Sequence, residues 1–148
     1  MTDPLQTVDR QNWMGLLARA NPARLAALFP DLPPHDMLRP PEVGAVMVQG
    51  RAGGTGLPFN LGEMSVTRCV LRLASGAVGH AHVQGRDKAH ATRAAILDAL
   101  LQTDRASGLQ TTVLAPLAAE ESARRQARAA KAAATKVEFF TLVRGEDQ

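Results

Sequence analysis

The sequence predicts an α+β domain: a four-stranded, mainly antiparallel sheet with helices packed on one face, in the order ααβββααβ. Three observations predict this fold class. Apolar residues recur with a helical period before the proline-rich segment 30–42 and alternate after it. Ser75-Gly76 separates two alternating segments, as a tight hairpin turn does, and a helical period returns after Asp87. The 148 residues, 45% of them hydrophobic, are expected to form a single domain over 1–148.

Two helices are expected near the start of the chain, over about residues 7–29. Trp13, Leu16 and Leu17 recur at spacings of three and four, and Thr7 is a suitable N-cap for the first helix. Pro22 is compatible with the first turn of the second helix. The five prolines of residues 30–42 then predict an extended connector, followed by sheet and helices over 43–148.

Three strands are expected next. Residues 42–50 have the composition of a buried strand, residues 64–73 alternate, and residues 77–85 return antiparallel after the Ser75-Gly76 turn. Alternation divides the second strand into two faces. One face carries Met64, Val66, Arg68, Val70 and Arg72, and the other carries Ser65, Thr67, Cys69, Leu71 and Leu73.

Two further helices and a last strand complete the prediction. Residues 87–102 have an apolar stripe behind Asp87, a good cap, and residues 137–145 have the composition of a strand. Residues 117–136 form an alanine-rich helix with few large apolar side chains, which predicts weak anchoring to its own core. Such a helix fits against a partner through Arg124, Arg125 and Arg128, or it is a solvated outer helix with an alanine face on the sheet.

The tetrapeptide Val-Gln-Gly-Arg occurs twice, at residues 48–51 and 83–86, each time before a candidate anion-binding or subunit-contact turn. The first turn is rich in glycine, whose N–H groups can converge on an anion. Its candidates are Arg51, Gly53, Gly54 and Thr55. The second opens a helix, whose N-terminus attracts anions. Its candidates are Arg86, Asp87, Lys88 and His90.

Each turn also has a purely structural interpretation. The glycine loop lacks the Gly-Lys-Ser/Thr of a Walker loop and the spacing of a dinucleotide loop, so a flexible connector between strands fits equally well. Asp87 can simply cap its helix while Arg86 and Lys88 remain solvated.

No self-contained catalytic group is evident. His80 and His82 face one side of the third strand, but two imidazoles need further ligands to hold a metal, so a partly exposed strand face is expected and no metal site. Cys69, the only cysteine, is expected to be a buried small hydrophobe. The sequence has no serine in a nucleophile elbow and no carboxylate pair whose spacing assigns an acid and a base.

Composition narrows the class of protein. The net charge of +3, 3% aromatic residues and the absence of tyrosine argue against a nucleic-acid-binding surface. Asp3 and Asp9 stand where a signal peptide has basic and then apolar residues, and no long uncharged stretch suits a membrane span. We therefore expect a cytoplasmic protein without membrane contact.

Several stretches of the chain, taken together, are specific to one family. They are RQNWMGLLARA, QGRAGGTG, TRCVLRL, VQGRDKAHATRAAILDAL and VLAPL followed by VEFFTLVRG. They run from about Arg10 to Gly145, nearly the whole chain. In this order they resemble the PhnG family, the G subunit of the bacterial carbon–phosphorus lyase core complex.

The resemblance implies a shared task rather than a complete enzyme. Proteins of this family act with the H, I and L subunits, which together replace the adenine of MgATP by a phosphonate and give alpha-D-ribose 1-methylphosphonate 5-triphosphate. The I subunit carries the nucleosidase chemistry, the J subunit later breaks the C–P bond with an iron–sulfur cluster and S-adenosylmethionine, and G, H, I and J form a hetero-octamer with two copies of each.

For this chain, the resemblance implies an accessory or scaffold role with no cofactor of its own, MgATP being a substrate of the complex. The alternative is a stand-alone anion- or nucleotide-binding module. In either case we hypothesise that Arg51, Arg86 and Lys88 converge on phosphate groups or on acidic residues of a neighbouring subunit.

Overall fold

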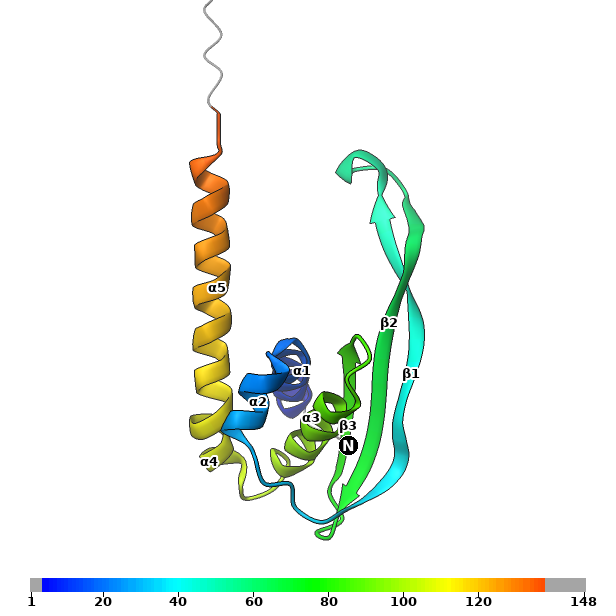
Figure 1. Ribbon diagram of the computed structural model, residues 1–148, viewed down its shortest axis with the longest axis vertical. Helices are drawn as coiled ribbons and strands as arrows, with labels where there is room; N and C mark the ends of the chain where they lie inside the picture. Colours follow the sequence, from blue (N-terminus) through cyan, green and yellow to red (C-terminus); the bar gives the residue numbers. More distant parts are fainter. Residues whose placement is uncertain (1–3, 138–148) are drawn as a thin grey trace, which may run out of the picture.

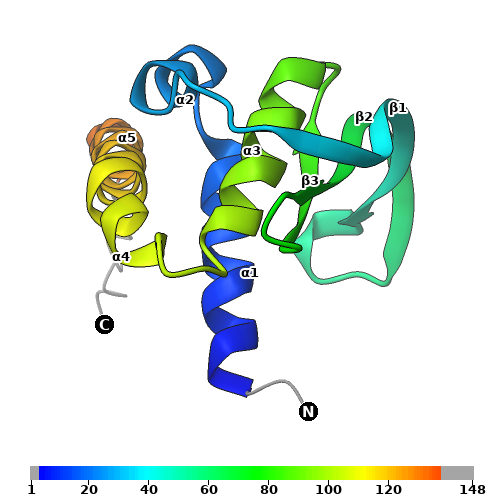
Figure 2. The same cartoon turned by 90° about the horizontal axis from the view of Figure 1, so that it is seen from below.

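The computed structural model describes residues 4–137 and confirms the α+β class: a three-stranded antiparallel sheet, in the order β1-β2-β3, with helices over one face (Figures 1 and 2). The fourth strand, expected over 137–145, lies outside the described residues except for Val137, which is not in a strand. The elements are α1 (Pro4–Arg19), α2 (Pro22–Leu28), β1 (His35–Arg51), η1 (Ala52–Gly54), β2 (Pro58–Leu73), β3 (Val78–Gln84), α3 (Lys88–Leu100), α4 (Ala106–Leu109), η2 (Gln110–Leu114) and α5 (Ala115–Ala134).

Both N-terminal helices are present, but the cap assignment for the first was wrong. Helix α1 begins at Pro4, so Thr7 lies within it rather than at its start. Helix α2 has Pro22 in its first turn, as expected. Its cap is Asn21, whose side-chain oxygen accepts hydrogen bonds from the N–H groups of Ala23 and Arg24 at 3.0 and 3.1 Å.

The extended connector is shorter than residues 30–42, because β1 begins at His35. Strand β1 can contain Pro40 and Pro41 because it forms the edge of the sheet and pairs with a neighbour on one side only. A proline N that faces away from that neighbour leaves no strand without a hydrogen-bond donor. The register of β1 with β2 also shifts between Arg39 and Glu42, so the two prolines fall in an irregular stretch of the pairing.

Strands β1 and β2 continue far beyond β3 and form a two-stranded arm. The last pair between β2 and β3 joins Val66 to Gln84, whereas the pairing of β1 with β2 continues to Arg51 and Pro58. We call residues 45–65 the arm; in Figure 1 it projects past α1, α2 and α3 and ends in η1. A two-stranded ribbon without further cover has marginal stability in water.

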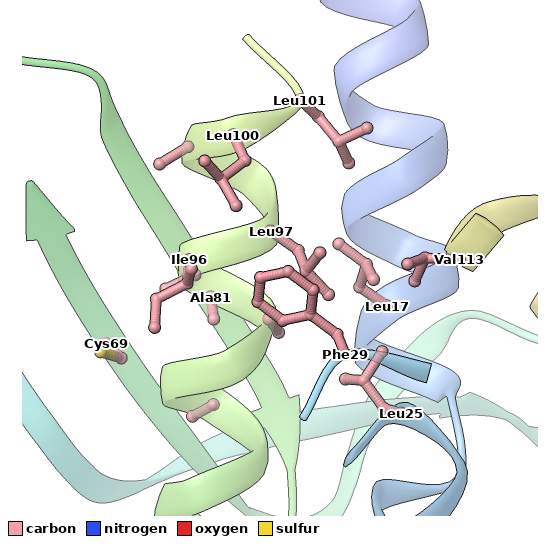
Figure 3. Close-up of a cluster of buried hydrophobic side chains, with 14 of the residues drawn as sticks. Leu17, Leu25, Phe29, Cys69, Ala81, Ile96, Leu97, Leu100, Leu101 and Val113 are labelled. Carbon is pink, nitrogen blue, oxygen red and sulfur yellow. The ribbon is translucent and has the colours of Figure 1, made fainter. Parts of the chain in front are cut away.

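The hydrophobic core lies between α3, the inner face of the sheet and the N-terminal helices. The predicted alternation of β2 is confirmed on its inner face, where Thr67, Cys69 and Leu71 are fully buried, while Arg68 and Arg72 on the outer face are exposed. Figure 3 shows side chains of α1, α2, α3 and η2 meeting in this cluster, among them Leu17, Leu25, Leu97 and Val113.

A buried carboxylate joins α1, α3 and β3. Asp98 of α3 is 0% exposed, and the guanidinium of Arg10 donates to its two oxygens at 3.1 and 2.7 Å. The indole N–H of Trp13 and the backbone N–H of His80 donate to the same carboxylate, each at 2.9 Å. A charge taken out of water must be paired and hydrogen-bonded in this way. Sequence reasoning missed it, although a charged residue within the apolar run of α3 was the available signal.

Removal of this carboxylate should strongly destabilise the fold. We expect Asp98→Ala to lower the free energy of unfolding by about 3–5 kcal/mol, because Arg10, Trp13 and the His80 N–H lose a shared acceptor. Asp98→Asn keeps one oxygen and should cost less, about 1–3 kcal/mol. Urea unfolding followed by circular dichroism measures both. Asp104→Ala, at an exposed carboxylate, is the matched control, and equal stability of Asp98→Ala and Asp104→Ala would contradict the assignment.

Candidate functional site

The first Val-Gln-Gly-Arg segment leads into the tip of the arm. Gly53 and Gly54 have φ values of 61° and 79°, which favour glycine, and both are exposed. The guanidinium of Arg51 is turned back onto the loop, where it donates to the carbonyl oxygen of Gly56 at 3.0 Å. Thr55 is also exposed. The loop is therefore a tight turn braced by Arg51, placed at the far end of the arm.

The second segment closes the turn between β3 and α3. Gly85 has a φ of 92°, its N–H donates to the carbonyl of Ser65 at 2.8 Å, and its carbonyl accepts from the Thr67 hydroxyl at 2.8 Å. Asp87 caps α3 by accepting from the N–H of His90 at 2.9 Å. This geometry matches the structural alternative, in which Asp87 occupies the helix end and Arg86 and Lys88 are exposed.

His90 does not belong to the surface at this helix end, contrary to the sequence prediction. The side chain is buried, 5% exposed, and its Nε2–H donates to the carbonyl oxygen of Leu17 at 2.8 Å. It points inward because the first turn of α3 packs against the C-terminal part of α1. His90 therefore links two helices of the core and is not available to an external anion.

The two arginine-bearing turns lie far apart. Arg51 is opposite Pro58 at the tip, whereas Gly85, next to Arg86, is bonded to Ser65. The interval from Pro58 to Ser65 along β2 spans roughly 23 Å at the rise of a β-strand. Within one copy of the chain, Arg51 and Arg86 therefore cannot contact the same small ligand. The hypothesis that Arg51 and Arg86 converge on one anion is wrong for a single copy of the chain.

The outer face of the sheet carries several basic side chains. His80 and His82 are exposed on one side of β3, as expected, and they lie opposite Val70 and Arg68 of β2. In the described part of the chain, no cluster of three histidine, cysteine, aspartate or glutamate side chains could hold a metal ion. A hollow of about 330 Å³ opens on this face. Its lining comprises Met14, Arg39, Val46, Arg68, Cys69, Val70, His80, Ala81 and His82.

Helix α5 stands apart from the sheet (Figure 1). The alanine face of this helix therefore does not pack on the sheet, contrary to one of the two interpretations of the sequence. Leu117 is its only buried residue. Two ion pairs near its start connect it to the N-terminal helices: Arg19 with Glu121 and Arg24 with Glu120, both at 2.7 Å.

Glu121 is the more tightly held of the two glutamates. The hydrogen bond from Arg19 lowers the pKa of the Glu121 carboxyl from its ordinary value. Arg125, one turn along α5, pairs with the same carboxylate at 3.0 Å. Arg124 and Arg128 are exposed, which leaves the outer length of α5 basic and uncovered.

Cys69 is confirmed as a buried residue, 0% exposed, in the inner face of β2. Burial raises the pKa of its thiol, an effect partly offset by a hydrogen bond with Thr92. The thiolate needed for nucleophilic chemistry is therefore disfavoured. No helix among residues 4–137 is both long enough and apolar enough to cross a membrane.

Two comparisons with known proteins bear on this arrangement. Residues 8–145 match the family model described as "Phosphonate metabolism protein PhnG". The chain is also 46% identical, over 153 aligned residues, to the "Alpha-D-ribose 1-methylphosphonate 5-triphosphate synthase subunit PhnG" of Rhizobium meliloti (strain 1021). That alignment covers 99% of this chain and 96% of the relative.

The thiol of Cys69 should be almost unreactive while the protein is folded. At pH 8 we expect native protein to react with a thiol reagent such as iodoacetamide at least about tenfold more slowly than protein unfolded in urea, because burial excludes the reagent and disfavours the thiolate. Mass spectrometry follows the reaction without background, since Cys69 is the only cysteine. Equal rates for native and unfolded protein would show an accessible thiol.

Proposed function

Because the chain belongs to the PhnG family of phosphonate metabolism proteins, we propose that it is a subunit of alpha-D-ribose 1-methylphosphonate 5-triphosphate synthase. The observation that carries this proposal is the 46% identity to a protein of that name across 99% of the chain and 96% of the relative.

Within that enzyme the chain acts as an accessory subunit. It works with the H, I and L subunits to replace the adenine of MgATP by a phosphonate, and it assembles with H, I and J in a hetero-octamer that holds two copies of each. The buried state of Cys69 and the use of Asp98 as a structural acceptor support a role outside the chemical step. MgATP is a substrate of the complex, and this chain carries no cofactor.

The arm supports a role in assembly. Its exposed apolar side chains include Met47, Leu57, Phe59 and Leu61, with exposed fractions of 54, 87, 46 and 66%. Exposed apolar groups concentrated on one projection are typical of protein–protein contact surfaces. Coverage by another subunit would also stabilise a ribbon that lacks a third strand.

Helix α5 is the second contact element. Beyond its ion pairs with the N-terminal helices it carries small alanine side chains and exposed Arg124 and Arg128. Alanine permits close approach of a second helix, and forked guanidinium groups pair well with carboxylates at interfaces. In Figure 1 the arm and α5 project from the core in the same direction, so one neighbouring subunit can contact both.

Adenine release should depend on the assembled enzyme. We expect the isolated chain, given MgATP and methylphosphonate, to release no adenine above background, and the complete set of G, H, I and L subunits to release it. Omission of this chain should greatly reduce the rate of the remaining subunits. Liquid chromatography quantifies adenine. Release by the isolated chain would refute the accessory role.

Apolar groups near the arm tip should be needed for assembly. We expect the double variant Phe59→Ser with Leu61→Ser to bind its companion subunits at least about tenfold more weakly, because truncation of buried apolar anchors typically costs 2 kcal/mol or more. Co-purification and light scattering measure the assembly. Leu38→Ser is the matched control, since Leu38 is also exposed on β1, at 49%, but lies outside the arm. Normal assembly of the double variant would exclude the arm as a contact.

A further inference from the structure

The outer face of the sheet brings two arginines and two histidines from three strands together. Arg39 of β1 is paired with Val70 of β2, which in turn lies opposite His80 of β3. Arg68 is directly opposite His82. Neighbouring strands are about 4.8 Å apart, so these four side chains arise within roughly 10 Å of one another across the sheet.

Within residues 4–137, these four basic side chains have no anionic partner. Among the residues that the structure describes, the side chains of Arg39, Arg68, His80 and His82 make no hydrogen bond or ion pair. Glu42 lies opposite Arg68 across the ladder, yet it is not within ion-pair distance. Arg10, Arg19 and Arg24, by contrast, all engage carboxylates.

The side chain of Arg68 ends beside Gly44 of β1. A Cβ atom added to Gly44 would be in van der Waals contact with it, 3.4 Å from a terminal nitrogen of Arg68 and 3.9 Å from the central carbon of its guanidinium. The guanidinium of Arg68 therefore lies next to the backbone of β1 at Gly44 and makes no ion pair with Glu42. In this position the Arg68 side chain borders the hollow. The lining of the hollow includes Arg39, Arg68, His80 and His82 and contains no carboxylate.

We propose that this hollow binds a phosphoryl or phosphonyl group of a small molecule. Its volume of about 330 Å³ falls within the range of small-molecule sites. Guanidinium groups match the oxygens of such anions with paired, charge-assisted hydrogen bonds, and the exposed imidazoles supply further donors. Met14 and Val46 add an apolar wall that suits the non-ionic part of the ligand.

A small anion fits this hollow better than an acidic segment of a partner protein. The centre of a protein interface is closely packed and leaves little open space, and the exposed apolar groups of the arm suit such a contact. The hollow instead concentrates charged groups around a concave space. The inference goes beyond the proposed function, because binding here requires no companion subunit.

Nuclear magnetic resonance of the full-length chain tests the proposal. Phosphate, methylphosphonate and ATP, each without magnesium, are titrated separately at about 0.15 M salt, where weak surface electrostatics are screened. We expect at least one of them to shift the ring signals of His80 and His82 in a saturable manner. A comparison of the three distinguishes a free phosphate, a phosphonate and a nucleotide as the source of the anion.

Three variants make the result specific. Arg68→Gln should weaken binding by about tenfold or more, through loss of a charge-assisted contact. Gly44→Val keeps every charge but fills the space beneath the Arg68 guanidinium, so it should also weaken binding. Arg105→Gln removes an equal charge from an exposed position outside the hollow and should change nothing. Thermal unfolding verifies that all three are folded.

The proposal has clear ways to fail. Absence of saturable shifts with all three anions would overturn it. Equal weakening by Arg68→Gln and Arg105→Gln would overturn it too, because it would indicate general attraction to basic charge. Shifts that appear only with an acidic peptide would assign the face to a protein partner and overturn it as well. None of these results depends on adenine release or on assembly. The proposed role as a synthase subunit is therefore tested independently of this anion site.

Discussion

The carboxylate of Asp98 is the constraint on which the rest of this structure depends. It is fully buried and has three groups of donors, from Arg10 and Trp13 of α1 and from the backbone of His80 in β3. A buried charge is tolerated only when such donors surround it, so the chain must bring its N-terminal helix to the helix–sheet layer. This one acceptor thereby fixes α1 relative to α3 and the edge of β3, and it leaves the outer face of the sheet uncovered.

The core that results lies at one end of the molecule, and two long elements leave it. Leu117 is the last buried residue of α5 among those described, and the arm extends past the final pair of β2 with β3. Both elements are held mainly by local forces, namely helix propensity in α5 and ladder hydrogen bonds in the arm. Elements of this kind gain most from contact with a neighbour, which is the physical basis for regarding the chain as one part of an assembly.

Local periodicity predicted those parts whose side chains meet the core directly. The alternation of Thr67, Cys69 and Leu71, the turn at Ser75-Gly76 and the cap at Asp87 all follow from short-range patterns, and each is present. The start of β1 could not be predicted in this way, because prolines normally disfavour strands and only the edge position of β1 makes them acceptable. The environment of Asp98 likewise joins residues more than eighty positions apart, which no local pattern reveals.

Tertiary packing and strand register, rather than sequence motifs, decide where the candidate residues lie. The sequence predicts His90 at the surface because it lies in the first turn of its helix. The packing of α3 on α1 instead turns its side chain toward the carbonyl of Leu17. Arg51 and Arg86 share a tetrapeptide but are separated by the length of the arm, since repeated sequence carries no information about register. Arg39 and Arg68 share no motif, and antiparallel pairing alone places them in one hollow with His80. On this sheet, a side chain's opposite partner is therefore a better guide to its surroundings than the motif in which it stands.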